Sequence, residues 1–449
     1  MKSVSKSAIY TLLTQIPSQI FGVIAGVFIT RMLGPEGRGI YALFFADITL
    51  LSVVFGFSLG TSITFYVSNQ RISKEKIMGL TILFSIITIL LSLLVLAVWL
   101  NLPYSDLLLP NENVTVPFIA IFCLFVIINQ VDLVSASFFQ GEQKFGIVNR
   151  VLLVNSGLSL TFYGVLFWLY SLELIDVDIH TVLYVALAII SLNVLHWHYQ
   201  FRKHLTYAIN FKFSWKNDIK PFLHFMGLDH FANILTFFNS RLVLWIIAFY
   251  YSDGSVGIFA VALGITQLLS MLSNPLSQVL FPVIWAVDAK KHLKVYTLFS
   301  RAHFSVLLIC AVVGISIAGI AIPLIYGEDF RASVEPLQLM FIPAILSCQT
   351  KIFSGVLFAE NKVKFYFFSA LVGFCLTLLL NVLLVPKYGV VGAALATSVS
   401  FIATFVITYL SMLLFVDLPT RNLFFLTLTD LKEVKLKLSA KLKGLNESN

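Results

Sequence analysis

The sequence predicts an all-α integral membrane protein with 12 transmembrane helices in two parallel six-helix repeats. Hydrophobic residues make up 59% of its 449 residues and charged residues only 12%, against about 25% charged residues in soluble domains. Runs of about 20 apolar residues, each long enough to cross a bilayer as a helix, recur along the whole chain. Short segments of the first half also return in the second half. These three observations exclude an ordinary soluble protein and favour a duplicated helical bundle.

The repeated segments keep a constant spacing. Gly39-Ile40-Tyr41-Ala42 corresponds to Gly257-Ile258-Phe259-Ala260, and Glu142-Gln143-Lys144 corresponds to Glu360-Asn361-Lys362, each pair 218 residues apart. One matched pair could be chance similarity between apolar spans, but a shared offset indicates a duplicated half. In a chain this hydrophobic, a duplication is typical of a secondary transporter built around a central pathway.

Apolar runs between polar breaks predict the helices in chain order. The first six lie near residues 8–30, 39–66, 77–100, 117–139, 148–170 and 180–200, and the second six near residues 222–249, 257–285, 295–321, 336–358, 365–385 and 390–415. Open strands are excluded because their backbone groups would stay unsatisfied in lipid. The predicted units are an N-terminal lobe (1–200), a cytoplasmic amphipathic linker (201–220), a C-terminal lobe (221–415) and a cytoplasmic basic tail (416–449).

The N-terminal stretch could pass for a signal peptide, because Lys2 and Lys6 precede an apolar run. However, Gln15 and Pro17 interrupt that run, and no small-residue cleavage site follows it. We therefore expect the first membrane helix to be retained.

Positive charge is distributed unevenly along the chain. The termini and one set of alternating loops hold 23 Lys and Arg residues, whereas the other set of loops holds 4. Since positive loops stay in the cytoplasm, both termini and the linker are expected there. Trp215 lies among lysines in the linker, which predicts a segment at the membrane interface. The net charge of +8 then reflects topology and anionic lipid rather than nucleic acid.

Several predicted helices carry polar residues at helical spacing, which gives each of them one polar face. The clearest sets are Asp229, Asn233, Thr236 and Ser240 in the seventh helix and Gln267, Ser270, Asn274 and Gln278 in the eighth. Small and hydroxyl residues on such faces can instead serve helix packing. For amide-rich faces on several helices, a shared hydrated cavity is the better interpretation.

Ionisable residues also fall inside the predicted spans. They are Asp47, Asp132, Asp229, Arg241, Arg301 and Lys351. A charge at a helix centre costs about 2.5–3.5 kcal/mol on insertion scales, so these residues must pair, reach an interface or line water. Arg301 lies near the start of its helix and could extend to the cytoplasmic surface. By the 218-residue offset, Asp132 corresponds to the residue directly before Lys351. Two interpretations stay open: a salt bridge between Asp132 and Lys351, or an anion site beside an ion-coupling carboxylate.

The sequence contains no pattern typical of catalysis, metal binding or a cofactor. The four cysteines lie in apolar spans without ligand-like spacing. Residues 34–39 form a glycine-rich turn, but no predicted strand precedes it, so a phosphate-binding loop is not indicated. We expect that the protein is not an enzyme and that it has no cofactor or metal site.

A series of motifs spreads over nearly the whole chain. They are Arg31-Met32-Leu33-Gly34-Pro35, Gln140-Gly141-Glu142-Gln143-Lys144-Phe145, Val256-Gly257-Ile258-Phe259-Ala260, Tyr326-Gly327-Glu328-Asp329-Phe330 and the stretch from Asn381 to Thr397. In this order they resemble the Wzx-type polysaccharide flippases. Those proteins belong to the MOP superfamily, which also includes MATE exporters and lipid II flippases.

The resemblance implies a MATE-like two-lobed bundle with a cationic cavity in the bacterial cell inner membrane. The implied substrate is an undecaprenyl-diphosphate-linked oligosaccharide repeat unit, such as an O-antigen unit of lipopolysaccharide, moved by alternating access. Coupling to H⁺ or Na⁺ is a further expectation. Expected partners are the lipid-linked oligosaccharide and membrane lipids, with a polysaccharide polymerase and chain-length proteins as further candidates. No nucleic acid is expected.

The candidate site residues follow from the intramembrane charges and polar faces. Substrate-binding candidates are Arg241, Arg301, Lys351, Arg31, Gln267 and Asn274, and ion-coupling candidates are Asp132, Asp229 and Asp47. Guanidinium groups suit a diphosphate because of their planar fork of donors. The family often carries an Asp-Arg pair in its seventh helix, whereas this chain has Asn239-Ser240-Arg241. Asp229 is a possible replacement for the missing carboxylate.

Two other functions stay open. A MATE-like cation-coupled multidrug exporter would share the fold, and only the sign of the cavity charge separates it from a flippase. Buried bases favour an anionic substrate. A membrane polysaccharide polymerase would need a large outer loop with catalytic arginines or histidines, whereas the predicted outer loops are short and poor in bases.

Overall fold

The computed structural model describes residues 2–101, 115–205, 208–286, 289–360, 362–416, 422–427 and 430. It does not describe the side chains of 2–13, 225, 228, 229, 232, 358, 359, 363 and 271–295, with 273 as the exception in the last range. The first half contains helices α1 (Lys2–Phe55), α2 (Leu59–Asn69), α3 (Lys74–Trp99), α4 (Val116–Gly141), α5 (Phe145–Ser171) and α6 (Ile179–His204). The second half contains a π-helical turn, η3 (Trp215–Ile219), then α7 (Lys220–Tyr250), α8 (Asp253–Ala286), α9 (Ala289–Tyr326), a 3₁₀ turn, η4 (Glu328–Ser333), α10 (Val334–Ala359) and α11 (Val363–Phe415).

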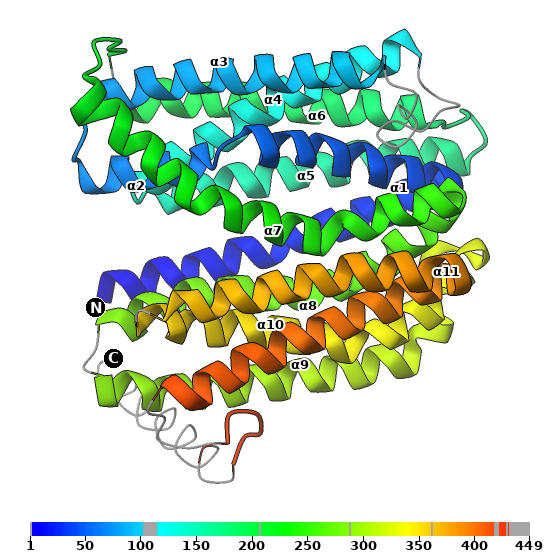
Figure 1. Ribbon diagram of the computed structural model, residues 1–449. Coiled ribbons are helices and arrows are strands. Elements are labelled where there is room, and N and C mark those ends of the chain that lie inside the picture. Colours follow the sequence, from blue (N-terminus) through cyan, green and yellow to red (C-terminus); the bar gives the residue numbers. More distant parts are fainter. Residues whose placement is uncertain are drawn as a thin grey trace, which may run out of the picture.

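Two of these helices cross the bundle twice. Ten helical stretches in the described part of the chain are long and apolar enough to span a membrane. Of these, α1 and α11 reverse direction at Gly34 and Gly389, where φ is +64° and +55° (Figure 1). Glycine adopts such left-handed angles without a steric penalty, and Pro35 follows the first turn directly. The described residues therefore make 12 crossings, which confirms the predicted all-α membrane fold.

The second predicted span is not one continuous helix. It ends at Phe55 and resumes at Leu59, and between them Phe57 and Ser58 have φ angles of 46° and 52°. Side chains rarely adopt such angles, so the helical ladder of hydrogen bonds is interrupted there. The amide of Asn233 on α7 donates to Ser58 Oγ at 2.8 Å. The break thus lies against a helix of the other half, which sequence periodicity could not predict.

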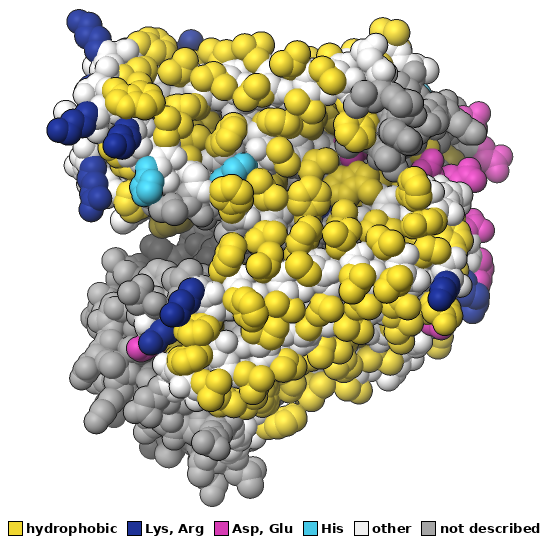
Figure 2. Space-filling view, in the orientation of Figure 1, with side chains coloured by type: hydrophobic (Ala, Val, Ile, Leu, Met, Phe, Trp, Pro, Cys, Tyr) yellow, Lys and Arg dark blue, Asp and Glu magenta, His cyan; other side chains and the backbone are white. Residues whose placement is uncertain are grey.

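The two ends of the bundle differ in charge, and its sides are apolar. Lys and Arg gather where α2 meets α3 and α4 meets α5, whereas Asp and Glu gather near η4 and the start of α6 (Figure 2). We call these the basic end and the acidic end. Hydrophobic side chains cover most of the face between them (Figure 2). A bilayer solvates such a belt, so the chain is a multi-pass membrane protein.

Side chains fix where two helices begin at the acidic end. Thr115 Oγ1 accepts a hydrogen bond from the Phe118 N–H at the start of α4, and Asp178 Oδ1 accepts from the Thr181 N–H at the start of α6. These contacts satisfy backbone donors that the first helical turn leaves without partners.

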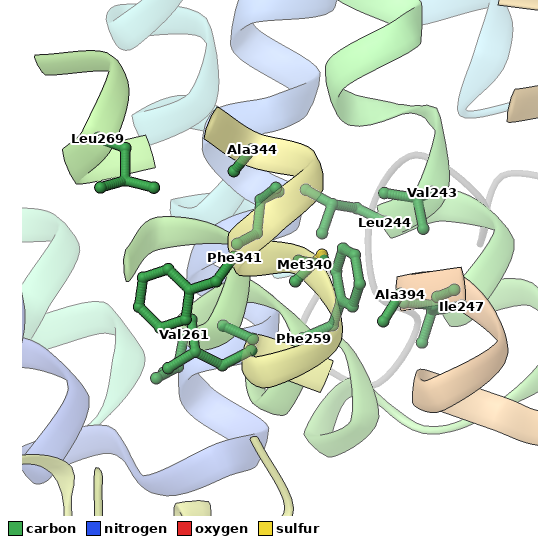
Figure 3. Packing of buried hydrophobic residues seen from close by; sticks show 14 of the residues in the cluster. Val243, Leu244, Ile247, Phe259, Val261, Leu269, Met340, Phe341, Ala344 and Ala394 are labelled. Carbon is green, nitrogen blue, oxygen red and sulfur yellow. The ribbon is translucent and has the colours of Figure 1, made fainter. Parts of the chain in front are cut away.

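Helix α7 connects two hydrophobic cores. In its second half, Val243, Leu244 and Ile247 pack with residues of α8, α10 and α11 (Figure 3). In its first half, Phe222 and Met226 pack with α2, α3, α4 and α6 instead. Helix α7 therefore runs from one lobe to the other, as its course in Figure 1 shows.

The duplicated glycines meet where the lobes join. A Cβ atom on Gly39 of α1 would overlap the carbonyl oxygen of Asp253, and one on Gly257 of α8 would overlap the carbonyl oxygen of Pro35. Asp253 and Pro35 each lie four residues before the glycine of their own helix, so the contact is reciprocal. A symmetric contact of this kind is expected between two copies of one repeat. Glycine at both positions lets the two backbones touch.

The linker lies against α3 at the basic end. Asn210 donates its backbone N–H to Glu75 O at 3.1 Å, and Lys76 Nζ lies 2.7 Å from Asp218 Oδ2. Burial raises the pKa of Asp218, but the hydrogen bond and charge of Lys76 and the Ser214 N–H outweigh it, so the pKa lies below its usual value. Trp215 and Phe211 remain exposed beside this contact, as an interfacial segment requires.

We expect Gly257→Leu to separate the lobes at the acidic end, because the new side chain has no space against α1. The distance between spin labels at Glu173 and Asp329 should grow by about 2 Å or more, toward ordinary helix spacing. Gly264→Leu on the same helix is the matched control, since no atom lies within 4 Å of a Cβ there. Equal distance distributions in the two variants would contradict a glycine contact that holds the lobes together.

We expect Asp218→Asn to destabilise the protein at neutral pH by roughly 1–3 kcal/mol, the range for hydrogen bonds to charged groups. A carboxylate whose pKa is lowered by folding stabilises the fold at pH values above its pKa in the unfolded state. It loses this effect as the pH falls through its pKa in the folded state. The difference from the unsubstituted protein should therefore begin to shrink near pH 4, the unfolded value, and should vanish only when the pH is below the folded pKa. Thermal unfolding at pH 7 and at acid pH tests this, with the exposed Asp176→Asn as control. A difference that persists in acid would count against the ion pair.

Candidate functional site

The second half of α1 and the second half of α7 share a buried carboxylate. Asp47 is 1% exposed, and its Oδ1 accepts a hydrogen bond from Trp245 Nε1 at 2.7 Å. Its other oxygen is buried with no hydrogen-bond partner among the described atoms. The ring of Phe237 lies 5.9 Å from that of Trp245. Burying a carboxylate beside aromatic rings with one hydrogen-bond donor costs free energy. This cost makes the interface a candidate functional site.

Each of these two helices also carries an arginine. Arg241 precedes Trp245 by one turn of α7, and Arg38 lies on α1 just before Gly39. Arg38 lies nine residues before Asp47 on α1, and Arg241 lies four residues before Trp245 on α7. Within the described part of the chain, no ion pair involves either arginine, and the buried Nε of Arg38 has no hydrogen-bond partner. The guanidinium of Arg38 lies 5.3 Å from the ring centre of Tyr41.

This pair gives the interface a positive field. Positive charges in a site of low polarity attract an anion, and guanidinium groups can bind oxyanions in a bidentate manner. The interface can therefore bind a phosphate or a diphosphate. It is not suited to a cation as long as both arginines are charged.

Arg31 has a different environment at the acidic end. Its Nε donates to Ile325 O at 2.7 Å, and its Nη2 donates to Leu324 O. These carbonyls belong to the last turn of α9, where helices leave acceptors without partners. Arg31 thus ties α1 to the other lobe beside the glycine contact.

Arg301 is engaged at the basic end. Its Nη1 lies 2.8 Å from Asp430 Oδ2, and its Nε donates to Asn422 O at 2.8 Å. Both partners belong to what we call the C-terminal segment, residues 422–427 and Asp430. This segment also inserts Leu423, which is fully buried. The contacts favour a reach of Arg301 toward the surface, the alternative left open by the sequence, over its expected place in the central pathway.

The remaining basic and amide candidates are spread over α8 and α10. Lys351 is exposed on α10, and Gln267 is half-buried on α8. The side chains of Asn274 and Asp229 lie outside the described residues. The structure therefore does not gather the six substrate-binding candidates into one cluster.

Asp132 is held inside the N-terminal lobe. Its Oδ1 accepts from Asn193 Nδ2 at 2.6 Å and from Trp197 Nε1 at 2.7 Å, both on α6. These donors, rather than Lys351, are the partners seen for its Oδ1.

Sequence reasoning missed Arg38 and Trp245. Arg38 falls between the first two predicted spans, 8–30 and 39–66, and therefore counts as an outer-loop residue in the sequence. The signal that could have placed it is its position next to the repeated Gly39 motif, which marks the lobe contact. Trp245 looked like one more apolar residue, and only the three-dimensional contact reveals its N–H as a donor to Asp47.

The comparisons with known proteins agree with this architecture. The chain belongs to the polysaccharide biosynthesis protein family, which matches it over residues 4–288. It is 30% identical over 161 residues to the probable flippase AglR of Haloferax volcanii, and this match spans 34% of each chain. It is 22% identical over 384 residues to the probable low-salt glycan biosynthesis flippase Agl15 of the same organism, covering 83% of this chain and 76% of that relative.

Solved structures share the fold. The lipid II flippase MurJ in an inward closed conformation matches with a TM-score of 0.72 at 16% identity, covering 92% of this chain and 89% of that one. An inward-facing multidrug resistance MATE transporter of the MOP superfamily matches with a TM-score of 0.63 at 15% identity, covering 91% and 98%. The two relatives are named as probable flippases, and the two solved structures are a flippase and a transporter. The chain is thus a member of the polysaccharide biosynthesis protein family with the fold of these transporters. This confirms the resemblance noted in the sequence.

We expect Trp245→Phe to destabilise the protein by about 1–3 kcal/mol, because Asp47 would lose its donor while staying buried. Adding Asp47→Asn should restore part of the loss, since a neutral amide costs less to bury than a carboxylate. Thermal unfolding in detergent measures both effects, with the exposed Trp168→Phe as control. If Trp245→Phe unfolds at the same temperature as that control, the hydrogen bond contributes nothing to stability.

Proposed function

We propose that this protein flips polyprenyl-diphosphate-linked oligosaccharides, of the undecaprenyl type, across the bacterial inner membrane by alternating access. The observation that supports this most directly is the pair Arg38 and Arg241 at the junction of the lobes. Both side chains are cationic and neither has an ion pair within the described part of the chain, so an anionic ligand would supply the missing negative charge. A diphosphate head group carries the required charge, and its lipid tail can remain in the bilayer.

The polar faces suit the sugar part of such a substrate. Gln267 of α8 and Asn233 of α7 are amides on helices that meet at the lobe junction. Amides offer both donors and acceptors, as sugar hydroxyls require. These groups do not identify a particular glycan.

The intramembrane carboxylates are the proposed sites of ion coupling. Asp47 lies in the same α1–α7 interface as the two arginines and has a buried oxygen without a partner. Asp132 receives two N–H donors from α6. Either carboxylate could bind H⁺ or Na⁺ when its neighbours move, and Asp229 is a further candidate.

Orientation follows from charge. We place the basic end, both termini and the linker in the cytoplasm, because the positive-inside rule applies to short loops such as these. The acidic end then faces outward, and Arg31 and the glycine contact close that side. Lipid-linked glycan and membrane lipids are the proposed partners, with a polymerase and chain-length proteins acting on the flipped product.

A multidrug exporter of the MATE type is less well supported. It shares the fold, but the α1–α7 interface presents two guanidinium groups to any ligand that enters. A cationic drug would be repelled there unless both charges were neutralised.

We expect Arg241→Ala to reduce surface glycan at least tenfold in a strain that depends on this protein, because an ionic hydrogen bond contributes about 1.5–3 kcal/mol. Arg38→Ala should act in the same direction. Arg241→Lys should restore activity only in part, since a single ammonium replaces a bidentate fork. Surface glycan and the membrane level of the protein are measured together, with Arg331→Ala, which removes an exposed charge at the acidic end, as the control.

The proposal predicts normal protein levels in these variants. If Arg241→Ala instead depletes the folded protein, and Asp229→Ala then restores it, Arg241 is a member of a structural ion pair. The electrostatic substrate site would have to be abandoned in that case.

A further inference from the structure

A chain of hydrogen bonds is buried around His303 of α9. The imidazole is 4% exposed; its Nδ1 lies 2.9 Å from Gln349 Oε1 of α10, and its Nε2 lies 2.8 Å from Ser273 Oγ of α8. Gln349 Nε2 donates to Ser300 Oγ at 2.5 Å, and Ser300 Oγ donates to Leu423 O at 2.8 Å. The chain therefore joins three helices of the C-terminal lobe to the C-terminal segment.

The direction of these bonds fixes the tautomer of the ring. The hydroxyl hydrogen of Ser300 points to the carbonyl of Leu423, so the oxygen of Ser300 must accept from the amide of Gln349. That orientation turns the Gln349 oxygen, an acceptor, toward His303. Nδ1 consequently carries a hydrogen, and Nε2 is the ring atom that can gain or lose a proton.

Ser273 can serve both states of Nε2. Its Oγ lies 3.0 Å from Leu269 O as well as 2.8 Å from the ring nitrogen. When Nε2 is bare, the hydroxyl can donate to it. When Nε2 carries a proton, it can donate to Oγ, and the hydroxyl can turn to the carbonyl. Neither state leaves a ring nitrogen without a partner, whereas a buried polar group without one is normally costly.

The charged surroundings of the ring are limited. The titratable or charged groups on the elements around it are Tyr296 and Arg301 of α9, Cys348 and Lys351 of α10, Tyr409 of α11 and Asp430 of the C-terminal segment. Arg301 is already paired with Asp430. The described stretch of α8 nearest the ring carries no titratable group, and Phe299 stacks on the imidazole with ring centres 6.3 Å apart.

Helix α8 connects this cluster to the lobe contact. Ser273 follows Gly257 by 16 residues of the same helix, about 24 Å along its axis. Any movement that separates Gly257 from α1 will shift Ser273 relative to α9 unless α8 bends. The acceptor available to a proton on Nε2 therefore depends on the position of α8.

We propose that His303 reversibly binds a proton at Nε2, and that occupancy of this site couples a pH gradient to the movement of α8. The ligand is a proton, and Ser273 and Gln349 are positioning residues. The coupling part rests on the proposed flippase function, whereas the proton site itself does not. The site adds to the carboxylates already considered, and it lies in the other lobe from Asp132.

Proton binding is tested without substrate. Protein labelled with ¹⁵N-histidine in nanodiscs should show an imidazole signal that is missing in His303→Gln and that changes between pH 5 and pH 8. His224→Gln, which removes an exposed histidine of α7, should keep this signal. Ser273→Ala should keep the imidazole but bind the proton about tenfold more weakly, because the protonated nitrogen loses its acceptor. A His303 signal that stays constant with pH would overturn the proposal, and so would an unchanged titration in Ser273→Ala.

Coupling is tested in vesicles that contain a fluorescent lipid-linked oligosaccharide. An imposed pH gradient should change the flipping rate of the unsubstituted protein and of His224→Gln, but not that of His303→Gln. A response of His303→Gln equal to that of the unsubstituted protein would overturn the coupling. If no form of the protein flips the lipid while the His303 signal still titrates, the flippase proposal fails and the proton site is supported.

Discussion

The backbone contact between Gly39 and Gly257 organises the rest of the molecule. It requires the absence of a side chain on both helices, and each glycine faces the carbonyl of the residue four positions before the other. Because α1 and α8 touch there, Arg38 is drawn into the junction and Asp47 is placed opposite α7. The functional interface is thus a consequence of where two copies of one motif meet.

A charged side chain buried in a membrane needs a hydrogen-bond or ionic partner, and the structure contains several kinds of partner. Asp47 accepts a hydrogen bond from an indole N–H, and Asp132 accepts one from an amide and one from an indole. Arg301 forms an ion pair with the carboxylate of Asp430. Arg31 uses the free carbonyls at the end of α9. Arg38 and Arg241 differ from these, since among the described residues neither has an ionic partner. That contrast, more than the number of charges, supports a ligand site at the α1–α7 interface.

The features of the structure that could be predicted from the sequence are those that leave a pattern along the chain. Apolar runs placed the helices to within a few residues, and the 218-residue offset identified the glycines that later proved to touch. The break at Phe57 and Ser58 has no such signal, because it depends on a contact with Asn233 of another helix. The same holds for Arg301, whose partner lies 129 residues further along the chain. Side-chain partners across lobes are a property of packing, and hydropathy does not encode them.

The path of α7 limits how the lobes can move. Its first half is packed into one core through Phe222 and Met226, and its second half into the other through Val243 and Leu244. If the acidic end opens, α7 must bend between these anchors or one core must yield. A packed core resists deformation, so bending between the anchors is the easier route. Arg241 lies close to the second anchor, so a bend below it would leave the arginine with the C-terminal lobe while Arg38 moved with α1. Opening would then move Arg38 and Arg241 relative to each other, and under the proposed function such a change at an anion site would favour release on the outer side.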